Sequence, residues 1–366
     1  MKITRSTKLS LKPCTAEKHV ELRRILDEYG RVVNGFISLF WDACPCKAKL
    51  LKPVVDSVDS WFSARLRKVA AREAIDMVRA CRKRDGEQAV KPVHGGKRMC
   101  VSSSVAELQI PKSTSEFDRW LHMQSIGGVI IDLPVRLHKH YHRLAARGRR
   151  VESYIIAQSS VQLCFEIETG SKREVKTAIG VDTGIKALAS LSTGEQLGTD
   201  IETCIHRITR CKRGSEGQKK ARRALRQRID ETARDVAGKA DLVVVENLKG
   251  ICHKTKVKRR LTQNMRRSVG SWNVRYWLER LQSRTEDNRV VFRSVPPQHT
   301  SSTCPACGHS DRSNRVARVF LCRACGHTDD ADINAAKNIL SRLLSGPYGA
   351  GFKASLRGSG CTTSAL

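Results

Sequence analysis

Hydrophobic positions in the first hundred residues follow two different periods. Residues 1–13 alternate apolar and polar side chains, which is typical of a β-strand. From Thr15 to Trp41 the apolar residues recur at spacings of three and four, which predicts an amphipathic helix. A second helix, with an apolar stripe and a basic remainder, is predicted from Ser60 to Arg84. The polar, glycine-containing stretch after it predicts a loop.

Short apolar runs bounded by Gly, Pro or Ser predict strands between residues 98 and 168. The predicted strands are Met99–Ser102, Val105–Ile110, Gly128–Leu133, Ser153–Ala157 and Val161–Ile167. They indicate a small β-barrel or sheet into which the two N-terminal helices are inserted. His138, His140 and His142 alternate among Lys and Arg, so we interpret them as a solvated nucleic-acid face rather than as a metal site.

In the C-terminal half the pattern changes to alternating strands and helices. Asp241–Glu246 is a continuous apolar run that ends in an acid, which is typical of a buried parallel strand. The other predicted elements are strands at Val175–Asp182, Ala187–Leu191, Gln196–Leu197 and Arg289–Val295, a long basic helix at Ile201–Gly238 and a helix at Ser271–Arg284. This order is that of an RNase H-like α/β fold. Residues 346–366, rich in Gly and Ser, are predicted to be disordered.

The charge of the chain narrows its possible partners. The 366 residues include 67 Lys and Arg against 36 Asp and Glu, so the formal net charge is +31. A charge this large indicates a polyanionic partner, because each phosphate that Lys or Arg neutralises releases condensed counterions. The apolar stretches are too short to span a bilayer, and Met1–Leu11 lacks the apolar core of a secretory signal. We therefore expect a nucleic-acid-binding protein of the cytosol, made of two or three domains.

Two basic stripes, Arg207–Arg228 and Gly250–Leu278, can track a phosphate backbone, although each could also be a solvated helix face. The aromatic residues within the second stripe are interpreted as core rather than as base-stacking platforms. The candidate nucleic-acid-binding residues are Arg207, Arg210, Lys212, Arg213, Lys254, Lys256, Lys258, Arg259 and Arg260.

Four of the fourteen cysteines form two Cys-x-x-Cys-Gly pairs, Cys304/Cys307 and Cys322/Cys325, with fourteen residues between them. Each pair can turn two thiolates toward one ion, and two such turns close a tetrahedral site that suits one structural Zn²⁺. A redox dithiol is the alternative, but it would not need a matching second pair. With four thiolates present, the neighbouring histidines are interpreted as spectators. The other ten cysteines are interpreted as reduced, small apolar residues.

Three acids stand where phosphodiester hydrolysis on an RNase H-like fold would need them. Asp182 and Glu246 each end an apolar strand, and Asp332 opens a predicted helix. Two adjacent strand ends and one helix start can bring three carboxylates together, and hard divalent cations relieve their repulsion. Two Mg²⁺ ions about 3.5–4 Å apart would then activate a water and stabilise the departing oxygen. Taken singly, Asp332 could be a helix N-cap, and Asp329 and Asp330 compete with it for the third place.

The acids and the paired cysteines lie in short motifs. In order along the chain, these are Gly-Val-Asp182-Thr-Gly, Val-Val-Glu246-Asn-Leu, the two Cys-x-x-Cys-Gly pairs and Ala-Asp332-Ile-Asn-Ala-Ala-Lys-Asn-Ile. In that order they resemble the signatures of the TnpB family, the RNA-guided endonucleases of insertion sequences, which are related to the type V CRISPR effector nucleases. The family's catalytic acids then fall on Asp182, Glu246 and Asp332, and its zinc ligands on the four paired cysteines. One departure is visible: Thr300-Ser-Ser-Thr-Cys304 stands where the family often has Thr-Ser-Gln-x-Cys.

The resemblance implies an α/β multidomain architecture. It comprises a wedge β-barrel (1–13 and 98–170), an inserted helical recognition domain (14–97), a RuvC nuclease domain (171–300 and 329–345) and an inserted zinc ribbon (301–328). It also implies a guide RNA from the transposon end, and cleavage of double-stranded DNA beside a short target-adjacent motif. The alternatives are a catalytically silent RNA-guided DNA-binding repressor and an accessory transposase. A location in the prokaryotic cytosol, at the nucleoid, is expected, with a monomer slightly favoured.

Overall fold

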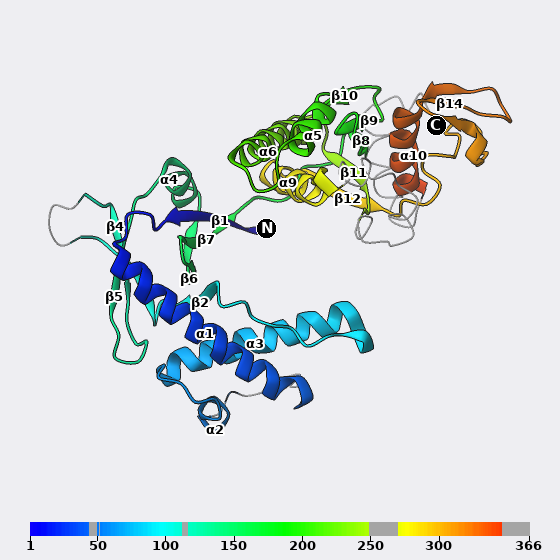
Figure 1. The fold of residues 1–366 in the computed structure, drawn as a ribbon. Coiled ribbons are helices and arrows are strands. Elements are labelled where there is room, and N and C mark those ends of the chain that lie inside the picture. The colour runs from blue at the N-terminus through cyan, green and yellow to red at the C-terminus, as the bar shows by residue number, and fades with distance from the viewer. Residues whose placement is uncertain (44–49, 51, 112–115, 249–269, 346–366) are drawn as a thin grey trace. The chain divides into compact units, whose positions relative to one another are not determined.

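The computed structural model describes residues 1–43, 50, 52–111, 116–248 and 270–345, in two compact units, Met1–Glu168 and Thr169–Leu366. Each unit is described separately (Figure 1). Among the described residues, no helix combines the length and the hydropathy that crossing a lipid bilayer requires.

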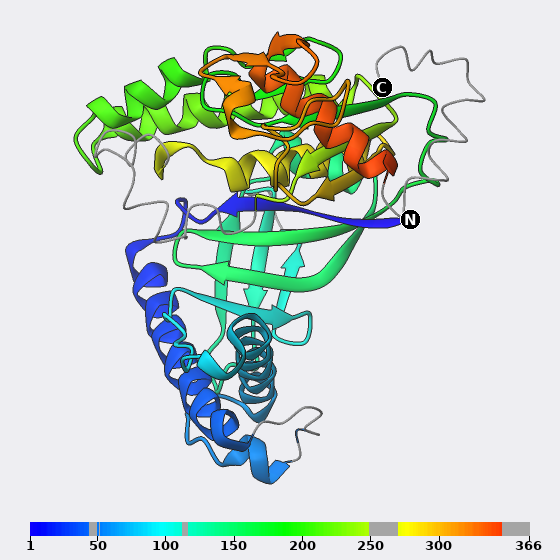
Figure 2. The ribbon, with the colours of Figure 1, turned by 90° about the vertical axis from the view of Figure 1, so that its right-hand side faces the viewer.

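Two long helices dominate the first unit. Helix α1 (Ala16–Ala43) packs along α3 (Ala64–Asp85), as Figure 2 shows, and the short α2 (Lys52–Asp56) precedes α3. The apolar stripe predicted for α1 is buried except at Val20, which is exposed, and Ser63 begins α3 by accepting the Leu66 N–H. The 3₁₀ turn η1 (Gly86–Gln88) ends this helical segment.

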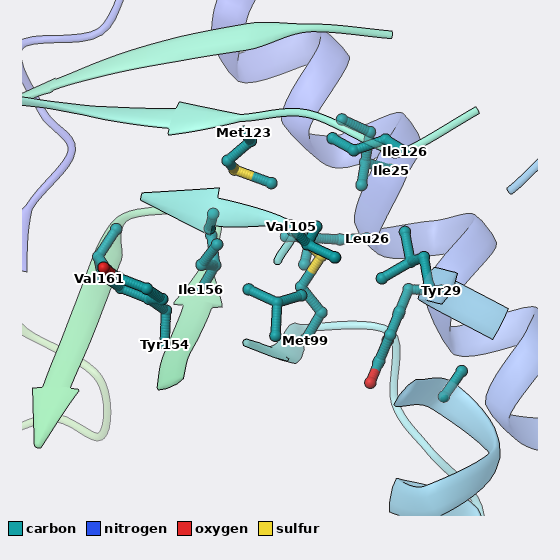
Figure 3. Close-up of a cluster of buried hydrophobic side chains, with 14 of the residues drawn as sticks. Ile25, Leu26, Tyr29, Met99, Val105, Met123, Ile126, Tyr154, Ile156 and Val161 are labelled. Atoms are coloured by element: carbon teal, nitrogen blue, oxygen red, sulfur yellow. The ribbon is translucent and has the colours of Figure 1, made fainter. Parts of the chain in front are cut away.

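The strands of the first unit pair as two antiparallel sheets. One has the order β1-β7-β6-β2 and the other β3-β4-β5. Their bounds are β1 Lys2–Ser10, β2 Arg98–Ser102, β3 Ala106–Gln109, β4 Arg119–Met123, β5 Ile131–Val135, β6 Arg149–Ala157 and β7 Ser160–Glu168. Strand β4 was not predicted from the sequence, and β5 begins three residues later than predicted. Both sheets and α1 contribute to one core, in which Tyr29 lies near Met99 and Val105 (Figure 3).

The alternating histidines belong to a short helix, α4 (Lys139–Ala145), that sequence reasoning missed: His138 is its N-cap, and His140 and His142 lie within it. His138 caps this helix by accepting the Tyr141 N–H, and its ring also lies within hydrogen-bond distance of the Thr7 hydroxyl, at 3.3 Å. The His140 ring stacks on that of His138. At least His138 thus has a structural role, because it ties α4 to β1.

Five strands of the second unit form a sheet in the order β10-β9-β8-β11-β12. Strands β8, β11 and β12 are parallel, and β9 and β10 are antiparallel to their neighbours. The bounds are β8 Ala178–Asp182, β9 Ala189–Leu191, β10 Gln196–Leu197, β11 Leu242–Glu246 and β12 Val291–Val295.

Helices cover both faces of this sheet. Val243 and Val245 face α5 (Ile201–Arg210), α6 (Glu216–Ala237) and α9 (Val274–Asp287), whereas Leu242 and Val244 face α10 (Ala331–Ser345). Figure 1 shows α6 and α9 on one side of β8 and β11, and α10 on the other. This burial of both faces explains why β11 reads as a continuous apolar run.

The single basic helix predicted over Ile201–Gly238 is wrong. The chain breaks it into α5 and α6 at Cys211–Ser215. Gly214 adopts a left-handed conformation (φ 81°) and Ser215 begins α6 by accepting the Gln218 N–H. A turn signal within a basic run thus overrides the helical periodicity on either side.

The paired cysteines lie in turns beside a small three-stranded sheet, which stands between β12 and α10 in the sequence. Its elements are η2 (Arg312–Asn314), β13 (Arg315–Val316), β14 (Val319–Leu321) and β15 (Thr328–Asp330), and β15 leads directly into α10. The predicted disordered tail, 346–366, lies outside the described residues.

Candidate active site

Asp182 and Glu246 end neighbouring parallel strands at the same level. Val181 of β8 pairs with Val245 of β11, so the two acids are the next residues on adjacent strands. Neighbouring strands lie about 4.8 Å apart, and their carboxyl ends meet at one edge of the sheet. The sheet therefore brings these two predicted acids together.

Helix α10 brings Asp332 to the same place because it packs very closely on β8. A Cβ on Gly180 would lie only 2.1 Å from the carbonyl oxygen of Ala336, so only glycine permits this approach. Asp182 is two residues beyond Gly180, about 6.6 Å along the strand, and Asp332 is four residues before Ala336, about 6 Å along the helix. Because these two distances from the Gly180–Ala336 contact are nearly equal, Asp332 lies beside Asp182 at the end of the strand.

The charges of the other two acids act on Asp182. Burial, together with the charges of Glu246 and Asp332, raises the pKa of Asp182 to about 7. Burial also raises the pKa of Glu246. Such a cluster of carboxylates is unfavourable in its ionised form unless cations neutralise it.

The donor set suits Mg²⁺. The three side chains offer carboxylate oxygens, the ligands that Mg²⁺ prefers, and Mg²⁺ keeps several of its waters, so the protein need not enclose it completely. Among the described residues, the four paired cysteines are the one group of three or more candidate ligands that lie close enough to share an ion, so the three carboxylates do not converge as tightly as the cysteine sulfurs do. Asp182, Glu246 and Asp332 are the residues that could hold it.

Two side chains that sequence reasoning missed hold these acids in place. The Thr300 hydroxyl donates a hydrogen bond to the Glu246 carboxylate, and Thr300 itself is buried. Arg315, from β13 of the small sheet beside the cysteines, forms an ion pair with Asp332 at 2.8 Å. Both partnerships join residues that are distant in sequence, so no local pattern could reveal them.

The motif that follows Asp332 has a structural explanation. The Asn338 side chain donates to the carbonyl oxygens of Thr300 (2.8 Å) and Thr303 (2.6 Å), and Asn334 donates to that of Thr303 (3.2 Å). The two asparagines are one helical turn apart and therefore share a face of α10. They fix the segment that carries Thr300, and hence Glu246, against the helix that carries Asp332.

The competing acids have other partners. Asp330 accepts the N–H groups of Asp332 (2.9 Å) and Ile333 (3.2 Å), so Asp330 caps α10 and the alternative of Asp332 as the cap is wrong. Asp329 pairs with Lys337 at 2.8 Å. Of the three neighbouring acids, Asp332 is the one whose charge raises the pKa of Asp182.

The four cysteines lie at the separations that a tetrahedral zinc site requires. The sulfurs of Cys304 and Cys325 are 3.7 Å apart and those of Cys307 and Cys322 are 3.6 Å apart. A Zn–S distance of about 2.3 Å in a tetrahedron gives S···S distances of about 3.8 Å. The residues therefore fit Zn²⁺.

Both cysteine turns have the same backbone hydrogen bonds. Cys304 N–H donates to His309 O and Gly308 N–H to Cys304 O; Cys322 and Gly326 repeat this arrangement. Gly308 and Gly326 have positive φ angles of 78° and 73°, which explains the glycine after each pair.

The predicted basic residues are only partly described. Arg207, Arg210, Lys212 and Arg213 are exposed at the end of α5 and in the following turn. Lys254, Lys256, Lys258, Arg259 and Arg260 lie outside the described residues. Trp277, in contrast, is fully buried and donates to the Thr183 hydroxyl at 3.2 Å, which confirms its interpretation as core.

Comparison with known proteins finds RNA-guided nucleases among the relatives of this chain. Residues 276–339 match the family model described as "Cas12f1-like, TNB domain". The chain is 45% identical over 49 residues to the putative RNA-guided DNA endonuclease InsQ of Escherichia coli (strain K12), covering 13% of this chain and 12% of InsQ. The CRISPR-associated endodeoxyribonuclease Cas12f1 of Sulfoacidibacillus thermotolerans is 31% identical over 79 residues, which are 20% of this chain and 19% of that protein.

Over these stretches the chain is similar to RNA-guided endonucleases of the TnpB and Cas12f kind. The matched stretches span less than a fifth of the length of these curated relatives, so the likeness is local. A solved structure of CasPhi-2 (Cas12j) bound to crRNA and phosphorothioate-DNA aligns with 93% of this chain and 91% of its own, at 10% identity and a TM-score of 0.45.

Proposed function

We propose that this TnpB-like chain is an RNA-guided DNA endonuclease that cleaves double-stranded DNA beside a short target-adjacent motif. The observation that carries the proposal is the convergence of Asp182, Glu246 and Asp332 at one sheet edge, where their charges raise the pKa of Asp182. A guide RNA from the transposon end and a double-stranded DNA target would be its partners. The net charge of +31 suits both.

The chain's own residues would each have a defined role in hydrolysis. Asp182, Glu246 and Asp332 would hold two Mg²⁺ ions, which when bound supply a nucleophilic water and stabilise the departing oxygen. Thr300 holds the Glu246 carboxylate in one orientation. Arg315 places a positive charge beside Asp332 and so limits the repulsion within the cluster.

The four cysteines would hold one structural Zn²⁺. Their four thiolates would leave no open coordination position, so the zinc would not take part in the chemistry. Its proposed role is to fix the small sheet that carries Arg315 and the segment that connects it to Thr300.

The decisive experiment is cleavage of a plasmid by the purified chain with its co-purified RNA, in Mg²⁺, by the original protein and by Asp182→Asn. We expect the variant to lose cleavage by several orders of magnitude. Asp235→Asn is the matched control, because Asp235 is exposed on α6 of the same unit. Retained cutting by Asp182→Asn would refute the site. No cutting by the original protein, with guided DNA binding intact, would instead favour the silent repressor.

A further inference from the structure

An arginine-rich groove lies between α6 and α9, on the sheet face opposite α10. It has a volume of about 440 Å³ and is open to solvent along one side. Arg223, Arg226 and Arg234 line it from α6, and Arg284 lines it from α9. Arg223 and Arg226 lie within the basic stripe Arg207–Arg228, whereas Arg234 and Arg284 lie outside both predicted stripes, and none of the four was among the individual candidate nucleic-acid-binding residues.

The acids of the groove already have partners. Asp230 accepts hydrogen bonds from Arg280 and from the Tyr276 hydroxyl (3.1 Å), and Glu231 accepts one from Gln227 (3.0 Å) and pairs with Arg228. In the part of the chain that the structure describes, no carboxylate lies within 4.0 Å of Arg223, Arg226, Arg234 or Arg284. The groove therefore holds four guanidinium groups that form no ion pair with a described carboxylate, although the charges of Asp230 and Asp287 act on Arg284.

Two details show that this charge is costly without an anion. The Nε–H of Arg284 is buried and has no hydrogen-bond partner among the described residues. Burial and the charges of Arg280 and Arg234 also lower the pKa of Arg284. Arg226 stacks on the Tyr276 ring at 5.8 Å, which orients its planar guanidinium and leaves its N–H donors available.

We infer that this groove binds the phosphodiester backbone of a nucleic acid. Arginine presents planar, forked donors that match phosphate oxygens. From Arg223 to Arg234 the stripe spans eleven residues, about 16 Å of helix. That is the length of about five nucleotides of a duplex strand at a rise of about 3.4 Å, so the groove suits a run of phosphates rather than one free phosphate. The assignment deepens the proposed function by naming a backbone contact away from the carboxylates.

The test measures binding of the full-length chain to fluorescein-labelled 30-base-pair RNA and DNA duplexes, without added Mg²⁺ or chelator, across a KCl series. The groove variant is Arg223→Gln/Arg234→Gln/Arg284→Gln. The control, Arg312→Gln/Arg318→Gln/Arg323→Gln, removes the same charge from exposed arginines of the small sheet beside the cysteines. Because binding is measured without Mg²⁺, the result does not depend on whether Asp182 is catalytic.

We expect the groove variant to bind about 10- to 100-fold more weakly near 0.15 M KCl, and its salt slope to fall by about 2–3. The control should change much less. Loss on RNA alone assigns the groove to the guide, and loss on DNA alone assigns it to the target. Arg223→Gln/Arg234→Gln alters only exposed side chains and provides a second test should the triple variant fold poorly. Equal losses in the groove and control variants would overturn the assignment.

Discussion

Replacing Gly180 with alanine, which adds a single methyl group, should move Asp332 away from Asp182 and Glu246. Gly180 lies at the closest contact between β8 and α10, where an added Cβ would be 2.1 Å from the Ala336 carbonyl oxygen and 2.9 Å from the Leu340 nitrogen. The clash is with the backbone of the helix, so no side-chain rotation can relieve it. In Gly180→Ala, α10 must therefore move away from the sheet.

The size of that movement follows from contact distances. A carbon and a carbonyl oxygen approach to about 3.3 Å at closest, so α10 must shift by about 1.2 Å. Overpacking of this kind costs about 1–3 kcal/mol, or roughly 2–12 °C in Tm for a unit of this size. Misplacement of a catalytic group by about 1 Å costs about 100-fold in rate, so activity should fall far more than stability.

Plasmid cleavage measured well below Tm separates these two effects, because almost all molecules are then folded. Gly238→Ala is the matched control: it lies in the same unit, and an added Cβ there would meet only ordinary contacts of 3.5 Å or more. We expect the control to cleave normally and Gly180→Ala to cleave about 100-fold more slowly at saturating Mg²⁺. If Gly180→Ala cleaves and melts like the original protein, the close approach of α10 does not position Asp332.

Three further outcomes test the rest of the site. Thr300→Val should lower cleavage about tenfold while Thr300→Ser restores it, because only the serine keeps a hydroxyl donor for the buried Glu246 carboxylate; equal losses in both would contradict this role. The raised pKa of Asp182, about 7, means that the metal-free fold loses stability as pH rises from about 4 to 7, and that protons compete with Mg²⁺ below pH 7. The rise in Tm on adding Mg²⁺ should thus be larger at pH 8 than at pH 6, and a rise that does not depend on pH would count against the assignment. Cys304→Ser should reduce bound zinc, measured by atomic emission, and lower Tm; a full zinc content would exclude Cys304 as a ligand.

Features of the site could be predicted from the sequence where a short local pattern determines the structure around the residue. The cysteine cluster was predictable because each pair and its glycine form a complete local turn, and spacing alone brings the pairs together. The convergence of Asp182 and Glu246 was predictable because both acids end apolar strands of the kind that pair in parallel. The break at Gly214 was missed because the helical periodicity on either side outweighed a short turn signal.

The partners of the acids could not be predicted, because each contact joins segments far apart in the chain. Thr300 is 54 residues from Glu246, and Arg315 is 17 residues from Asp332 across a separate small sheet. Neither residue type signals its role: an isolated threonine or arginine in a basic chain has many ordinary explanations. Only the packing of α10 shows that the two asparagines after Asp332 hold the segment that ends at Thr303.

These contacts make the cysteine cluster and the carboxylates parts of one assembly. Thr303, whose carbonyl accepts from Asn334 and Asn338, directly precedes Cys304, a proposed zinc ligand. Arg315, which pairs with Asp332, lies in the small sheet between the two cysteine pairs. If the cysteines hold zinc as proposed, loss of the ion would release both the residue that orients Glu246 and the residue that pairs with Asp332. Such a zinc would then influence the reaction without taking part in the chemistry, because it would fix the partners of two of the three acids.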